Sequence, residues 1–322
     1  MEATKTPLKV YVLWHKDYKD GREYADVLYN EFSRKEDDFA GESLGIPIYF
    51  LNKPAVDLGL ISSGAQHIAF ILLVNSKMAL DAEWQKFVYS LCDFAESNSN
   101  VKIYPVSISS IEACNTITRK IAKINFIQLA DIAKFESDKC LKFKEKAYYL
   151  CFEIAHELSR LLFKRERASY DEQPNIPPAV RIFLSHARID GKNYADELNN
   201  YLSTNTPLDR FIDVYNIPKG EDFEKTINRY LDGSALLIMY TDAYSSREWC
   251  QHEALYAKYK GCPIVLVDAL EKGEPRRFPY IANVKTIHLG HDIISNNKKR
   301  DIIYAVLIET LKINLMSCSC HI

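Results

Sequence analysis

Short apolar runs alternate with amphipathic stretches along the second half of this 322-residue chain, and this alternation limits its fold more than any other feature. Runs typical of strands lie at residues 180–184, 210–214, 235–241, 263–267 and 284–288. Patterns typical of helices lie at residues 192–202, 221–231, 246–259 and 298–315. Parallel strands need long crossover connections, which are usually helices. We therefore expect an α/β domain in which helices cover both faces of one parallel sheet.

The first half of the chain repeats this plan. Strands are expected at residues 10–14, 46–51, 68–74 and 101–107, and helices at residues 21–32 and 82–95. A local echo accompanies the repeat: Asp20, Gly21, Tyr24, Ala25 and Asp26 recur as Asp190, Gly191, Tyr194, Ala195 and Asp196. Trp84 and Trp249 also lie in corresponding helices. We interpret the chain as a duplication of one α/β domain.

A helix-forming stretch followed by prolines separates the two halves. The stretch covers residues 137–167, and Pro174, Pro177 and Pro178 follow it. Proline ends a helix and favours an extended connector. We therefore predict domains at residues 1–136 and 177–322, joined by a linker at residues 137–176.

Charge and hydropathy argue against some classes of partner. The chain has 41 basic and 43 acidic residues and a formal net charge of -2, so we expect no direct binding of nucleic acid. The N-terminus lacks a secretory signal pattern, and the run Ile68 to Val74 is far shorter than the roughly 20 residues of a membrane span. The eight cysteines show no framework spacing. We expect a cytoplasmic protein with no membrane partner.

The residues that follow the strands of the second half are the candidates for a functional site, because ligands of open α/β sheets bind outside the carboxyl ends of the strands. Ser185, His186 and Arg188 follow the first expected strand, and Asp213 lies near the end of the second. The segment 215–220 comes next, and a polar segment at residues 242–246 follows the third strand.

The helix after the third strand carries an aromatic residue and a carboxylate at helical spacing. Ser245 and Glu248 have capping-box spacing, which predicts a helix start near Ser246. Trp249 and Glu253 then lie four residues apart on one face. The ring could stack on a base or nicotinamide, and the carboxylate could stabilise positive charge on a sugar. The spacing alone equally allows a core tryptophan and a solvated glutamate.

A second alternative is a hydrolase triad of Ser185, His186 and Asp213. No GxSxG elbow surrounds the serine, so this alternative has little support from the sequence.

Three segments, VRIFLSHARIDG, FIDVYNIPKGEDFEKTI and TDAYSSREWCQHEALYAK, together resemble Toll/interleukin-1 receptor (TIR) domains, especially bacterial ones. The resemblance covers about residues 180–289 and implies a flavodoxin-like fold. The family includes enzymes that cut NAD at the nicotinamide glycosidic bond, giving ADP-ribose or a cyclised isomer. The resemblance implies that Glu253 is catalytic and that five residues bind the substrate: Ser185, His186, Arg188, Asp213 and Trp249.

The resemblance further implies that NAD is the substrate and that neither a metal nor another cofactor is needed. It also implies activation by self-assembly with other TIR domains, through the loop residues Ile217, Pro218, Lys219 and Gly220. An NAD-cleaving protein of this kind would act as a stress or anti-phage immune effector. The alternative is a non-catalytic TIR scaffold that signals by binding other TIR domains.

The first half departs from the pattern at its site positions. His15 and Lys16 stand where the serine loop is expected, and Val88 follows Trp84 by four residues. An aliphatic side chain cannot stabilise a cation. We therefore expect a degenerate TIR-like domain used for sensing or assembly, with a nucleotide or protein trigger as one hypothesis.

Overall fold

The computed structural model describes residues 5–34, 43–54, 57–62, 64–108, 121, 124–130, 132, 137–163, 178–212, 222–272, 278–289 and 294–319. The chain forms two compact units, Met1–Ile154 with Cys318–Ile322, and Ala155–Ser317. The division falls inside helix α6 (Lys139–Leu161), in the segment expected as a linker. The domain limits drawn from the sequence stay a prediction.

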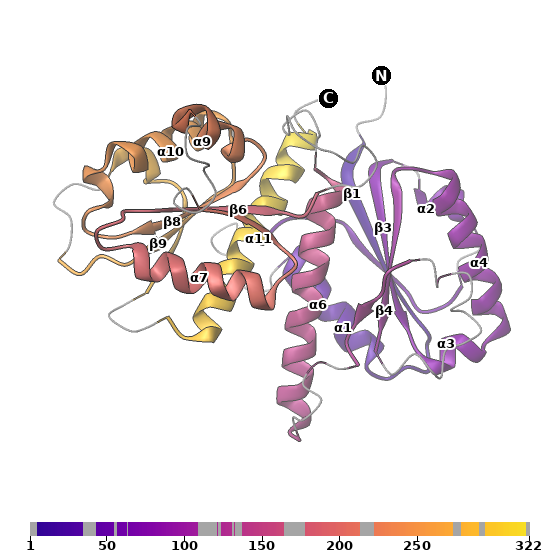
Figure 1. Ribbon diagram of the computed structural model, residues 1–322. Helices are drawn as coiled ribbons and strands as arrows, with labels where there is room; N and C mark the ends of the chain where they lie inside the picture. Colours follow the sequence, from indigo (N-terminus) through magenta and orange to yellow (C-terminus); the bar gives the residue numbers. More distant parts are fainter. Residues whose placement is uncertain are drawn as a thin grey trace. The chain divides into compact units, whose positions relative to one another are not determined.

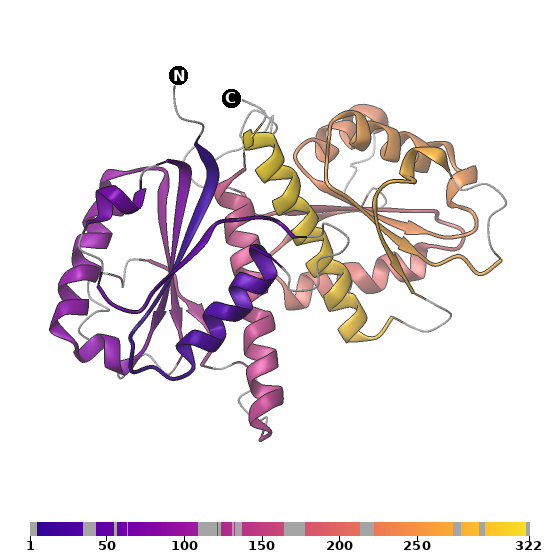
Figure 2. The same ribbon diagram turned by 180° about the vertical axis from the view of Figure 1, so that it is seen from behind.

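The first unit contains a five-stranded parallel sheet in the order β2-β1-β3-β4-β5. Its strands are β1 (Thr6–Trp14), β2 (Ile48–Leu51), β3 (Ala65–Val74), β4 (Val101–Ser107) and β5 (Ile127–Gln128). Its helices besides α6 are α1 (Gly21–Phe32), α2 (Leu58–Ser62), α3 (Ser76–Leu80) and α4 (Ala82–Ser97). Figures 1 and 2 show α1 on one face of the sheet and α3 and α4 on the other. From Ile68 to Val74 the central strand β3 is buried on both faces, which explains the unbroken apolar sequence of that part.

The second unit has the same topology. Its strands are β6 (Arg181–His186), β7 (Asp209–Phe211), β8 (Ala235–Tyr240), β9 (Ile264–Asp268) and β10 (Lys285–His288), in the order β10-β9-β8-β6-β7. All pairs are parallel. Its helices are α7 (Lys192–Asn205), α9 (Phe223–Leu231), α10 (Glu248–Tyr259) and α11 (Asn296–Ser319), with 3-10 turns η3 (Tyr244–Ser246) and η4 (Pro279–Ile281). Numbered from its first strand, each sheet has the flavodoxin-like order 2-1-3-4-5. The expected α/β fold is confirmed in both units.

The sequence echo between the halves has a structural cause at its glycines. Gly21 begins α1, and a Cβ on it would lie 2.4 Å from Cδ1 of Trp14 at the end of β1. Gly191 precedes α7, and a Cβ on it would lie 3.0 Å from the Ala187 carbonyl oxygen. In both units, a glycine therefore lets the first helix begin close to the end of the first strand.

The start of α10 differs from the expected capping box. The helix begins at Glu248, and Arg247 occupies the N-cap position without a side-chain cap. Ser245 and Ser246 belong to η3, where the Ser246 hydroxyl donates to the Ala243 carbonyl at 2.7 Å. Serine hydroxyls compete for nearby backbone groups in turns. The predicted helix start at Ser246 was therefore wrong by one short turn.

Helix α11 corrects the expectation that no segment has the length and composition of a membrane span. It is the one helix of the described residues that is long and apolar enough by those two criteria. Several of its apolar residues are fully buried in the structure: Ile302, Ile303, Val306, Leu307 and Leu311. Core helices pass the same test, and this burial is typical of them.

Candidate active site

A cavity of about 690 Å³ lies at the carboxyl ends of β6 and β8. Its size falls in the range of about 300 to 1,000 Å³ that is typical of ligand sites. Eight residues line it: His186, Ala187, Arg188, Ile189, Arg247, Trp249, Cys250 and Glu253. The structure thus brings together four residues predicted from the sequence, which are His186, Arg188, Trp249 and Glu253.

Glu253 is 4% exposed, although it lines this cavity. One of its carboxylate oxygens, Oε2, accepts a hydrogen bond of 2.5 Å from the hydroxyl of Ser185. Ser185 is buried near the end of β6 and does not line the cavity. The structure therefore places this predicted substrate-binding residue behind the carboxylate.

Tyr244 adds a second hydroxyl to this arrangement. Its Oη lies 2.7 Å from the Ser185 Oγ and 3.2 Å from the Cys250 carbonyl oxygen. Burial and then the neighbouring Glu253 carboxylate raise the pKa of Tyr244 well above its usual range, so the phenol keeps its proton. The sequence placed Tyr244 at this edge of the sheet but gave it no role.

Trp249 lies at the cavity with 45% of its surface exposed. Its ring meets the His252 ring edge-on, with 5.6 Å between the ring centroids. His252 in turn lies 3.0 Å from Oδ1 of Asn228 through its Nε2, which fits a hydrogen-bonded structural histidine. Trp249 and Glu253 both lie on α10 and line this cavity.

Two arginines share the cavity. Arg188 follows β6, and Arg247 precedes α10. A guanidinium is always charged and matches phosphate oxygens in a bidentate manner. The sequence analysis missed Arg247, because the expected helix start placed it inside the helix. The cavity therefore offers an aromatic face, two cations and a carboxylate.

Carboxylates brace the loops around the cavity. Oδ1 of Asp190 accepts a hydrogen bond of 2.7 Å from the Thr241 hydroxyl, and its Oδ2 accepts one of 2.9 Å from the Ala243 amide. Asp242 accepts bonds of 3.2 Å from the amides of Glu271 and Lys272. These bonds tie the loop after β8 to the loops after β6 and β9.

Part of the predicted site lies outside the described residues, which omit 213–221. This gap contains Asp213 and the expected assembly loop Ile217, Pro218, Lys219 and Gly220. The triad alternative loses its serine–histidine pair, because Ser185 and His186 are neighbours on a strand and point to opposite faces. Ser185 instead bonds Glu253.

The matching edge of the first unit is built differently. His15 is buried, its Nδ1 accepts from the Asp17 amide at 3.1 Å, and its Nε2 lies 3.3 Å from Oδ2 of Asp81. Asp81 caps the N-terminus of α4. The hydrogen bond that it accepts from the Trp84 backbone amide is the largest of the effects that lower its pKa. Trp84 and Val88 are both buried in the apolar core. The tryptophan here packs in the core, and the position four residues later carries no charge.

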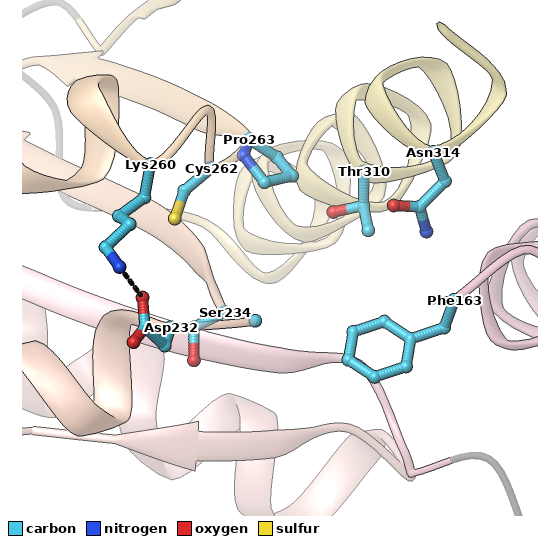
Figure 3. A pocket seen from close by; sticks show the side chains of 9 residues that line it. Phe163, Asp232, Ser234, Lys260, Cys262, Pro263, Thr310 and Asn314 are labelled. Carbon is cyan, nitrogen blue, oxygen red and sulfur yellow. Dashed lines mark ion pairs between the residues drawn. The ribbon is translucent and has the colours of Figure 1, made fainter. Parts of the chain in front are cut away.

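A second cavity of the same unit, of about 160 Å³, lies beyond the amino ends of β8 and β9 (Figure 3). Lys260 and Asp232 form an ion pair of 3.5 Å beside it, and Thr310 and Asn314 of α11 face it. Ligands of open α/β sheets bind at the opposite, carboxyl edge. The larger cavity is therefore the candidate active site.

Comparisons with known proteins identify one domain. A search of curated proteins found no match. A protein described as a phosphosugar isomerase from Silicibacter pomeroyi is 9% identical over 98% of this chain and 86% of its own, with a TM-score of 0.25. The C-terminal domain of glucosamine-fructose-6-phosphate aminotransferase from Francisella tularensis is 12% identical over 98% and 85%, with a TM-score of 0.19. Such scores carry no functional argument.

The family comparison is specific to the second half. Residues 182–303 match the family model of the TIR domain. This range contains every residue that lines the candidate active site. The TIR-like character of the first half stays a prediction. The C-terminal half of this chain therefore contains a TIR domain.

Proposed function

We propose that this TIR domain cleaves NAD at the bond between nicotinamide and ribose, with Glu253 as the catalytic residue. TIR domains serve either in signalling or in NAD cleavage. One observation favours cleavage here: a buried carboxylate lines a cavity that also contains an exposed tryptophan and two arginines. A domain that only binds other domains has no need of a carboxylate buried in this position, since burial of a charge is unfavourable unless it is paired.

In the proposed reaction, the glycosidic C–N bond breaks and its electron pair moves to the nicotinamide ring, which leaves as a neutral molecule. The ribose becomes an oxocarbenium-like cation, and the carboxylate of Glu253 stabilises this developing charge. Water then captures the cation to give ADP-ribose and a proton, or an adenine nitrogen captures it to give a cyclised isomer. Neither step of this scheme requires a further cofactor.

The other residues of the cavity suit the remaining parts of NAD. Trp249 offers a ring face for the nicotinamide or the adenine. Arg188 and Arg247 offer charges for the two phosphates. His186 completes the wall next to Glu253. Asp213 remains a predicted contact.

We further propose the setting in which this activity operates. The protein would act in the cytoplasm as a stress or anti-phage immune effector, with self-assembly of TIR domains as its activating step. The first unit would receive a nucleotide or protein trigger. The competing proposal is a scaffold that signals by homotypic TIR binding without chemistry.

Glu253→Gln tests the proposed function. The substitution keeps the size of the side chain and removes its charge, so we expect nicotinamide release from NAD to fall by about a hundredfold or more. Glu248→Gln is the matched control, because Glu248 lies on the same helix, is exposed and does not line the cavity. The measurement is nicotinamide release by the full chain, with thermal unfolding recorded for each variant. Equal turnover in Glu253→Gln and the parent would assign the chemistry elsewhere, and an inactive parent would favour the scaffold.

A further inference from the structure

We propose that Tyr244 is a positioning residue that holds the catalytic carboxylate of Glu253 through the hydroxyl of Ser185. The inference rests on the proposed function, because it concerns how the same carboxylate is set for the reaction. Tyr244 touches neither the cavity nor the site of the substrate. Tyr244 is connected to the catalytic carboxylate by a line of two hydrogen bonds. The first joins the Tyr244 and Ser185 hydroxyls, and the second joins Ser185 to Oε2 of Glu253.

The direction of these bonds follows from counting protons. An ionised carboxylate has no proton and can only accept. The single proton of Ser185 therefore goes to Oε2 of Glu253, at 2.5 Å. Ser185 then has no proton left for Tyr244. The single phenol proton has two acceptors within reach, the Ser185 hydroxyl oxygen at 2.7 Å and the Cys250 carbonyl at 3.2 Å, and the shorter distance assigns it to Ser185. The line runs one way, from Tyr244 to Ser185 to Glu253.

Burial makes this line rigid. Tyr244 is fully buried and belongs to the same core cluster as β6, β8 and α10. Ser185 is also buried, so water does not replace either donor. A hydrogen bond to a charged group contributes more to stability than one between neutral groups. The phenol therefore fixes which way the serine hydroxyl points, and the serine fixes one oxygen of the carboxylate.

Without the phenol, the serine hydroxyl would be free to turn. It could then donate to another acceptor, and Oε2 of the Glu253 carboxylate would lose its bond from Ser185. Because charge stabilisation depends on a preorganised carboxylate, the chemical step should slow while binding of the substrate changes little.

Tyr240 provides a matched control for a buried phenol. It is fully buried in the same core cluster, and its ring centroid lies 5.5 Å from that of Tyr244. Its hydroxyl accepts from the Phe278 amide at 3.2 Å. Tyr240→Phe thus removes a hydroxyl from the same core and leaves the line to Glu253 in place.

The experiment compares nicotinamide release by the full chain carrying Tyr244→Phe, Tyr240→Phe, Ser185→Ala or the pair Tyr244→Phe with Ser185→Ala. We expect Tyr244→Phe to lower kcat about tenfold with KM within about twofold. Ser185→Ala should lower kcat at least as much. The pair should be no slower than Ser185→Ala alone, because Tyr244 acts through the serine.

The possible outcomes separate this inference from the proposed function. An inactive parent would overturn both. An active parent with Tyr244→Phe equal to Tyr240→Phe in kcat and KM would overturn the inference alone, and so would losses that multiply in the pair. If Tyr244→Phe does not fold, 4-fluorophenylalanine at position 244 fills the space of the hydroxyl without donating, and the same kinetic criteria apply to it.

Discussion

At the scale of single residues, Trp249 and Glu253 share one face of α10 but differ in exposure, 45% against 4%. Because of this difference in exposure, the two side chains contribute to the site in different ways. Glu253 is held inside the fold by Ser185, whereas Trp249 lies open to whatever enters the cavity. A substitution at Trp249 should therefore affect binding with little change in the packing of the domain.

We predict that Trp249→Ala raises KM for NAD about tenfold or more and lowers the melting temperature only slightly. Loss of an aromatic stacking partner weakens base binding by roughly 1 to 3 kcal/mol. Trp249→Phe keeps a ring and serves as the control, with a smaller rise in KM. The measurement is steady-state nicotinamide release over a range of NAD concentrations. A change confined to kcat would mean that Trp249 does not hold the substrate.

At the scale of the elements, some bounds follow from the sequence and others do not. The limits of α1 and β4 were predicted as observed, because apolar periodicity and flanking polar residues mark both ends. Strand β5 has only two residues, too few for a pattern, and was missed. The cap of α10 was wrong because a 3-10 turn took the serines. Short elements depend on tertiary contacts that local sequence does not encode.

The candidate site was predictable in part for the same reason. The spacing of Trp249 and Glu253 is local, so the helix period was enough to place them together. The bond from Ser185 to Glu253 joins residues 68 apart in sequence, and that between Ser185 and Tyr244 spans 59. These contacts form only when α10 packs on β6. No periodic pattern in the sequence predicts contacts between residues so far apart.

Helix α6 carries a pH-sensitive contact. His156 is buried, and its Nε2 accepts a hydrogen bond of 3.3 Å from the Val180 amide. Burial first, and then the charge of Arg160, lower the pKa of His156 from 6.5 to about 4. Glu157 approaches the other ring nitrogen, with Oε1 at 3.9 Å from Nδ1. Protonation at Nε2 would remove the acceptor for Val180.

We predict that the free energy of unfolding falls in mild acid because His156 stays neutral in the folded chain. Above pH 6.5 the histidine is neutral in both states, so its full contribution is present. Between pH 6.5 and about 4 the unfolded chain binds a proton that the folded chain does not, so the free energy of unfolding falls. The upper limit of the effect is about 3 kcal/mol. Urea unfolding at pH 7, 5 and 4 should show a shallower decline in His156→Gln; equal declines would exclude this role.

At the scale of the whole molecule, the two sheets have the same strand order but different side chains at their carboxyl edges. In the second unit the edge holds the cavity with Glu253. In the first, Trp84 and Val88 are core residues, and His15 is committed to Asp17 and Asp81. A duplicated fold thus leaves one candidate site among the described residues.

We predict that assembly of TIR domains controls the activity of the whole molecule. Pro218 restricts the expected assembly loop and Gly220 permits turn conformations, so we expect the loop to bridge neighbouring TIR domains. Specific activity should then rise steeply with protein concentration, and Gly220→Pro should suppress the rise without unfolding the monomer. The measurement is nicotinamide release per molecule across a hundredfold dilution series, together with light scattering. Activity per molecule that stays constant on dilution, with no assembly, would rule this control out.

The bracing of two loops by Asp190 affects how a ligand would be received. One carboxylate holds both the Thr241 hydroxyl and the Ala243 amide, so the loops after β6 and β8 are joined before any ligand arrives. Ordering a loop upon binding opposes affinity through lost conformational entropy. Here that loss occurs when the domain folds. The cavity wall formed by the residues after β6 is thus anchored to the loop after β8 by the fold itself, and a ligand need not order that wall.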